Sequence, residues 1–162
     1  MPATPAATPA ADFVQLPALQ PAPLRDELRA ILGLNRRWKV VVVGAGNLAQ
    51  ALSSYREFRR QGFEIVAIFD TDPKKVGQEW DGVPVLPMQR FLEEARTHHF
   101  DVGVITTPAN AAQDVADLMV KAGVGGILNF APQALRVPQE ISVRNVNMAI
   151  EFESLSFALS MK

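Results

Sequence analysis

The chain has 162 residues, 48% of them hydrophobic, and a formal net charge of −1 at pH 7. This charge supplies no positive field to recruit nucleic acid, and the absence of cysteine excludes disulfides, thiolate metal sites and thiol redox chemistry. No apolar run approaches the roughly 20 residues needed to cross a membrane, and no secretory signal pattern is visible, so we expect a cytoplasmic protein without membrane or direct nucleic-acid partners.

The first part of the chain differs in composition from the rest. Residues 1–23 hold six of the twelve prolines among many alanines, and Asp12 is their only charged residue. Such a segment lacks a repeating apolar face, so we expect a flexible tail. The next residues, 24–34, have the spacing of a short amphipathic helix, with Gly33 near its end.

A strand followed by a glycine turn is the most informative pattern. Residues Lys39 to Val43 are predicted to form a strand, whose four valines indicate burial on both faces. A helical pattern then begins at Asn47 and is expected to run to Gln61. Free backbone N–H groups at such a turn bind anions, and a dinucleotide pyrophosphate is the usual ligand. The alternative is that the glycines only make a tight turn. The candidate cradle consists of Gly44, Ala45, Gly46, Asn47, Leu48 and Ala49, the last standing where a third glycine is common.

An acid follows the second predicted strand, residues 64–69. Asp70 lies 24 positions after Gly46, close to the spacing of roughly 20 for the acid that binds an adenosine ribose. A carboxylate there accepts hydrogen bonds from ribose hydroxyls and repels a 2′-phosphate, which favours NAD(H) over NADP(H). Lys74 and Lys75 could reach a phosphate, but we expect them to be solvated residues at the start of a turn.

The later elements continue the alternation of strands and helices. Residues 83–86 are expected to form an edge strand, because Pro84 has no N–H to donate. We expect Thr107 to be the N-cap of a helix, Pro108 its first residue and Gly123 its stop. The remaining elements are predicted at 88–97 (helix), 101–106 (strand), 109–122 (rest of that helix), 126–130 (strand), 141–146 (strand) and 150–160 (helix).

Successive βα units predict the α/β class, with a single Rossmann-like, doubly wound, mostly parallel sheet and a C-terminal helix. The predicted organisation is a tail at 1–23, a nucleotide-binding domain at 24–149 and a C-terminal helix at 150–162. In the last helix Met148, Phe152, Leu155 and Leu159 are spaced 4, 3 and 4 apart. This spacing fits either packing within one subunit or an exchange between subunits.

Ligands of such sheets bind beyond the carboxyl ends of the strands. Besides the cradle, the residues expected at that edge are Asp70, Thr71, Thr106, Thr107, Pro108, Asn129, Phe130, Ala131 and Pro132. They include no histidine or lysine to donate a proton beside a hydride site. His98 and His99 precede the strand 101–106 and fall at the opposite edge. We therefore expect nucleotide binding without catalysis, and no metal site.

Several of these segments resemble the Rex redox-sensing transcriptional repressors, and the similarity runs from about Leu24 to the end. The segments that carry it are 32–38 leading into the glycine turn, 69–77, Thr107-Pro108 with 111–113, and 127–132. The resemblance implies a homodimer whose Rossmann domains bind NADH or NAD⁺, with the C-terminal helix exchanged between subunits. It also implies that the cofactor residues are 44–49, Asp70, 106–108 and 129–132.

The resemblance further implies a winged-helix DNA-binding domain before the Rossmann domain, which residues 1–23 are unable to build. We therefore expect a sensory domain without its own DNA reader. The oxidised nicotinamide ring is cationic, so an apolar wall of Pro108, Phe130 and Ala131 should favour NADH.

Three alternatives stay open on the sequence. The first is a CoA-binding module, against which Asp70 argues because CoA carries a 3′-phosphate. The second is a small NAD-dependent oxidoreductase or its subunit. The third is a mixed dimer with a full-length Rex partner.

Overall fold

The computed structural model describes residues 21–32 and 36–162. Contacts divide the chain between Arg37 and Trp38, later than residue 24, where the sequence placed the start of the nucleotide-binding domain. Helix α2 (Pro21–Ile31) precedes this division. It begins before residue 24 because proline is tolerated in the first turn of a helix, where its missing N–H has no partner. The rest of the predicted tail and Gly33 lie outside the described residues.

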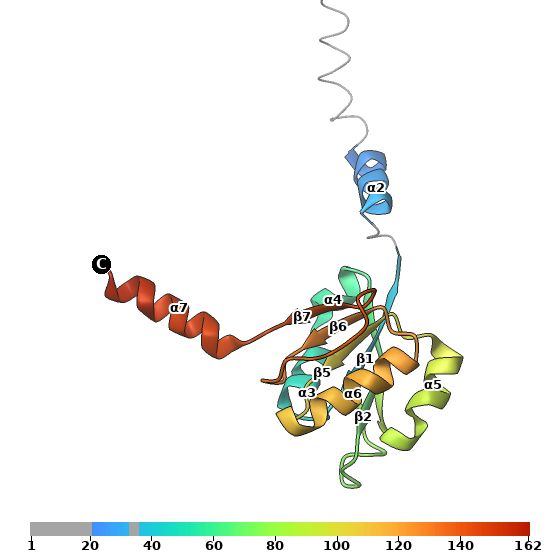
Figure 1. The fold of residues 1–162 in the computed structure, drawn as a ribbon. Helices are drawn as coiled ribbons and strands as arrows, with labels where there is room; N and C mark the ends of the chain where they lie inside the picture. Colours follow the sequence, from blue (N-terminus) through green and yellow to red (C-terminus); the bar gives the residue numbers. More distant parts are fainter. Residues whose placement is uncertain (1–20, 33–35) are drawn as a thin grey trace, which may run out of the picture. The chain divides into compact units, whose positions relative to one another are not determined.

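A seven-stranded sheet forms the second unit, with the order β3-β4-β2-β1-β5-β6-β7 (Figure 1). Every neighbouring pair is parallel except β3 and β4, which confirms the predicted fold class. The strands are β1 (Trp38–Val43), β2 (Phe63–Asp70), β3 (Glu79–Trp80), β4 (Val83–Pro87), β5 (Val102–Ile105), β6 (Gly126–Asn129) and β7 (Ser142–Asn145).

The prediction that residues 83–86 form an edge strand was wrong, because β4 lies between β2 and the two-residue strand β3. Pro84 is tolerated there since the hydrogen bonds on the β3 side use its neighbour. The Val85 N–H donates to the Gln78 carbonyl at 2.8 Å, and the Val85 carbonyl accepts from the Gly77 N–H at 2.9 Å. The missing N–H of Pro84 therefore costs no hydrogen bond to β3.

The predicted single helix from Asn47 to Gln61 was also wrong, because two helices occupy it: α3 (Asn47–Ser53) and α4 (Arg56–Arg60). At the break, the hydroxyls of Ser53 and Ser54 donate to the Gln50 carbonyl at 2.7 and 3.2 Å. Such local bonds compete with the helical pattern. Tyr55 then takes an extended conformation and begins the second helix.

The other helices are the 3-10 turn η1 (Met88–Arg90), α5 (Phe91–His98), α6 (Ala109–Lys121) and α7 (Met148–Ser160). Thr107 is not the N-cap of α6 and Pro108 is not its first residue, because Pro108 stays extended at ψ 159° and takes the cap position. The stop is as predicted, since Gly123 follows the C-cap at φ 84°. Among the described residues, no helix combines the length and apolarity that a membrane span requires.

Helix α7 begins two residues before the predicted start. The Asn147 side chain caps it by accepting hydrogen bonds from the N–H groups of Ala149 and Ile150 at 3.0 and 3.3 Å. Asparagine is among the preferred N-cap residues, so the cap accounts for the earlier start.

The core lies on both faces of the sheet. Val41 and Val43 pack into one apolar cluster and Val40 and Val42 into the other, and all four valines are at most 6% exposed. Helices α5 and α6 contribute to the first cluster and α3 to the second (Figure 1). The predicted two-sided burial of the valine strand is thereby confirmed.

One side chain ties the long segment between β6 and β7 to helix α6. The Gln113 amide donates to the Arg136 carbonyl at 2.8 Å and accepts from the Arg136 N–H at 2.8 Å. We expect Gln113→Ala to lower the free energy of unfolding by about 1–2 kcal/mol, because these two partly solvated hydrogen bonds and an exposed one to the Asp117 carboxylate at 2.8 Å are lost. Urea denaturation measures this, with Gln133→Ala as the control because the Gln133 side chain is exposed and makes no hydrogen bond in the described chain. Equal midpoints for the two variants would contradict the prediction.

Candidate functional site

The turn after β1 is held against both neighbouring strands. Gly44 has φ 107°, and its N–H donates to the Phe69 carbonyl of β2 at 2.8 Å. The Thr106 hydroxyl, just beyond β5, donates to the Gly44 carbonyl at 2.7 Å. A Cβ on Gly44 would lie 2.7 Å from the Thr106 carbonyl oxygen, so only glycine fits this position.

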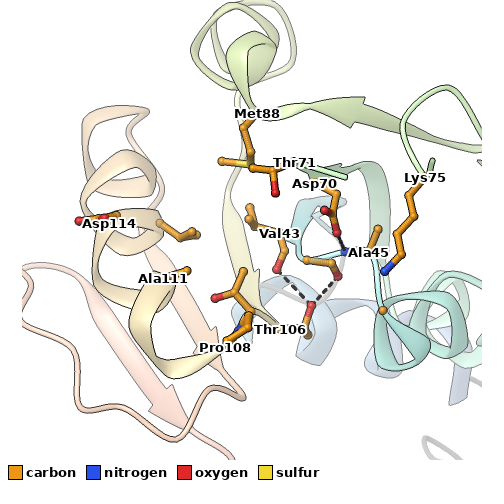
Figure 2. Close-up of a pocket in the computed structure, with 14 residues that line it drawn as sticks. Val43, Ala45, Asp70, Thr71, Lys75, Met88, Thr106, Pro108, Ala111 and Asp114 are labelled. Carbon is orange, nitrogen blue, oxygen red and sulfur yellow. Dashed lines mark hydrogen bonds between the residues drawn. The ribbon is translucent and has the colours of Figure 1, made fainter. Parts of the chain in front are cut away.

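Asp70 meets this turn directly (Figure 2). Its Oδ2 accepts a hydrogen bond from the Ala45 N–H at 2.6 Å, and its Oδ1 accepts from the Asp72 N–H at 2.8 Å. The carboxylate is half-buried and fixed in orientation. The spacing that singled out Asp70 in the sequence therefore corresponds to a contact with the glycine turn.

A cavity of about 340 Å³ lies beyond the carboxyl ends of β1, β2 and β5. Met88 lies on one side of it and helix α6 on another, with Pro108 between the turn and that helix (Figure 2). The lining includes eight of the predicted site residues: Gly44, Ala45, Gly46, Asp70, Thr71, Thr106, Thr107 and Pro108.

The other predicted residues do not line this cavity. Asn47, Leu48 and Ala49 form the first turn of α3, where Ala49 is fully buried against the sheet. Asn129, Phe130, Ala131 and Pro132 follow β6. The buried Asn129 shapes that segment by accepting from the Ala131 N–H at 3.0 Å and donating to the Gln133 carbonyl at 2.9 Å. A ligand contact of these residues stays a prediction.

Among the lining residues that the structure describes, sequence reasoning missed six: Val43, Lys75, Met88, Ala111, Asp114 and Val115. Lys75 corrects an expectation, because it is half-buried in the cavity wall whereas Lys74 is exposed. Ala111 and Val115 carried a usable signal, since together with Pro108 they have the spacing of one helix face. Met88 follows β4. A prediction that placed β4 inside the sheet would also have placed Met88 at this edge.

The lining combines apolar walls with few polar groups. It holds two carboxylates, one ammonium group and threonine hydroxyls. The Thr107 Oγ1 is buried and has no hydrogen-bond partner in the described structure, and such an orphaned hydroxyl gains a partner when a polar ligand enters. Within residues 21–32 and 36–162, no group of three or more His, Asp or Glu side chains is placed to hold a metal.

These features define a Rossmann-like nucleotide-binding domain, with a glycine turn after the first strand, an acid at the end of the second and a cavity across the carboxyl edge. Residues 35–133 match the CoA binding domain family.

The relatives cover most of this chain. The redox-sensing transcriptional repressor Rex of Carboxydothermus hydrogenoformans is 49% identical over 134 residues, which are 83% of this chain and 64% of that protein. The chain thus spans less than two thirds of that relative's length. The solved structure of RSP, a Rex-family repressor, matches with a TM-score of 0.79 at 30% identity and covers 94% of this chain and 76% of RSP. RSP in complex with β-NADH matches with a TM-score of 0.79 at 32% identity over 86% of this chain and 67% of RSP. The chain therefore belongs to the Rex family of redox-sensing transcriptional repressors, which confirms the family predicted from the sequence.

Proposed function

We propose that this chain binds NADH and NAD⁺ in the cavity beside the glycine turn and reports their ratio without catalysing a reaction. The observation that carries this proposal is the Asp70 carboxylate, fixed against the turn at the wall of a cavity of about 340 Å³. The solved complex of RSP with β-NADH supports the choice of ligand. The residues proposed to hold the dinucleotide are Gly44 to Ala49, Asp70, Thr71, Thr106 to Pro108 and Asn129 to Pro132.

The residues of the turn fit a dinucleotide. A Cβ on Gly46 would meet nothing within 4 Å, so the backbone there is open to the close approach of a diphosphate. Asp70 is placed to accept hydrogen bonds from the ribose hydroxyls, and the orphaned Thr107 hydroxyl offers one more polar contact. CoA fits less well, because its ribose carries a 3′-phosphate that the Asp70 carboxylate repels.

The sensing role follows from the charge of the nicotinamide ring. The oxidised ring is a cation and the reduced ring is neutral, and an unpaired cation is costly beside apolar groups. A wall of Pro108, Phe130 and Ala131 would therefore bind NADH more tightly than NAD⁺. Lys75 is the one lysine among the lining residues that the structure describes, and it lies beside the glycine turn. We therefore expect no proton donor at the hydride position and no NADH turnover with carbonyl compounds.

We further propose that the chain forms a homodimer in which helix α7 is exchanged between the two subunits. One side of the helix carries Met148, Phe152, Leu155 and Leu159, and Ile150 and Phe157 fall on the opposite side. All of these side chains are between 55% and 66% exposed. A helix with two opposed apolar faces needs cover on both sides, which a second subunit supplies. A full-length Rex subunit would offer the same cover in a mixed dimer.

Calorimetric titration with NADH tests the ligand. We expect Asp70→Asn to bind NADH about tenfold more weakly, since a charge-assisted hydrogen bond to the ribose is lost. Asp72→Asn is the matched control, because Asp72 also accepts a backbone N–H, from Lys74 at 2.9 Å, yet does not line the cavity. We expect it to change the affinity by less than about twofold.

A thermal melt of each variant separates loss of binding from loss of fold, because Asp70 also accepts two backbone N–H groups. A wild-type chain that binds neither NADH nor NAD⁺ at millimolar ligand would overturn the proposed function. Tighter binding of CoA than of NADH would instead favour the CoA module.

A further inference from the structure

Lys75 is the lysine that the fold brings to the cavity. Its N–H donates to the Asp72 carbonyl at 3.0 Å, and its own carbonyl accepts from the Gln78 N–H at 3.2 Å, so the turn after β2 fixes its backbone. Lys74, one residue earlier, is exposed and does not line the cavity. The same turn thus separates two adjacent lysines into one that lines the site and one that faces solvent.

The side chain of Lys75 runs beside Ala45 with its ammonium nitrogen towards the glycine turn (Figure 2). Within the described residues, the ammonium has no hydrogen-bond or ion-pair partner. A half-buried ammonium without a partner has lost part of its hydration and gains most from an anion placed next to it.

The charges of the lining show where an anion is stabilised. Asp70 and Asp114 are the two carboxylates, and Lys75 is the only cation among the lining side chains that the structure describes. Asp70 disfavours an anion at its own position, beside the ribose in the proposed pose. Lys75 therefore offers the charge complement at the glycine turn, where the diphosphate of a dinucleotide lies in folds of this kind.

We propose that Lys75 binds the diphosphate of the adenine dinucleotide and gives the cavity its preference for phosphate-bearing ligands over the bare nucleoside. This inference rests on the proposed function. Asp70 accepts hydrogen bonds from the ribose hydroxyls and Lys75 contacts the phosphates, so the two side chains bind different parts of the adenosine diphosphate group.

Calorimetry with NADH, ADP and adenosine tests the inference. We expect Lys75→Met to bind NADH and ADP about tenfold more weakly, while its affinity for adenosine is unchanged. Lys75→Arg should retain most of the affinity because the charge is kept. Lys74→Met is the matched control and should bind all three ligands within about twofold of the wild type, since its ammonium is solvated.

The dependence on salt gives a second readout. Raising the KCl concentration should weaken ADP binding by the wild type more than by Lys75→Met, because the charge contact is screened. Two results would overturn this inference while wild-type binding of NADH leaves the proposed function standing. The first is an unchanged ADP affinity in Lys75→Met, and the second is a loss of ADP affinity in Lys74→Met equal to that in Lys75→Met. Failure of the wild type to bind either dinucleotide would overturn the proposed function and this inference with it.

Discussion

Gly44→Ala is expected to lower the free energy of unfolding by about 3–5 kcal/mol, which is a large part of the stability of an ordinary domain. Two costs combine at this position. The backbone has φ 107°, and the added Cβ would lie 2.7 Å from the carbonyl oxygen and 2.8 Å from the carbonyl carbon of Thr106. These are backbone atoms at the end of β5, so they are unable to move aside as a flexible side chain would. Urea denaturation followed by circular dichroism measures the loss.

Substitutions at two other glycines distinguish the cost of the positive φ from the cost of the steric contact. Gly123 has φ 84° but open space around its Cβ position, so Gly123→Ala should lose only about 1 kcal/mol. Gly46 has neither a positive φ nor a neighbour within 4 Å, so Gly46→Ala should keep the wild-type midpoint while its methyl group hinders a bound dinucleotide. A midpoint for Gly44→Ala equal to that of Gly123→Ala would show that the turn relaxes around the methyl group.

Leu155→Glu and Phe157→Glu are each expected to dissociate the proposed homodimer, with a dimer dissociation constant at least about 100-fold above that of the wild type. The two residues lie on opposite faces of α7 and are 56% and 66% exposed in the single chain. A carboxylate at either position would be buried without a partner in the proposed assembly, once on each subunit. Sedimentation velocity at micromolar concentration measures the change.

Ser156→Glu is the control for added charge, because Ser156 lies on the polar stripe of α7 with Glu153 and Ser160. It should leave the dimer intact. A wild-type chain that is monomeric at these concentrations would contradict the prediction. Dissociation by Leu155→Glu but not by Phe157→Glu would show that a single face of the helix forms the interface.

The sheet was predictable because the apolar composition of its central strands indicates that they are buried. The valine run of β1 and the apolar strands β2, β5 and β6 have no polar face, as expected of a parallel sheet covered on both sides. Asp70 was also predictable, because the helix and strand that separate the glycine turn from the acid at the end of the second strand have a typical combined length.

The errors arise where the residues in the sequence are compatible with more than one local structure. The break after α3 depends on serine hydroxyls that bond to the Gln50 carbonyl, and the same residues occur in unbroken helices. The two-residue strand β3 is too short to leave a pattern. Lys74 and Lys75 are chemically identical in the sequence, and only the direction of the turn after β2 decides which one lines the cavity.

The position of β1 at the centre of the sheet has a consequence for biosynthesis. Its partners are β2 (Phe63–Asp70) and β5 (Val102–Ile105), so one edge of this valine strand stays open until the ribosome has released residue 105. An unpaired apolar edge is a template for pairing with other chains. The nascent chain is therefore most exposed to misassembly while residues 71 to 105 are being made, and a translational pause in that interval would lengthen the exposure.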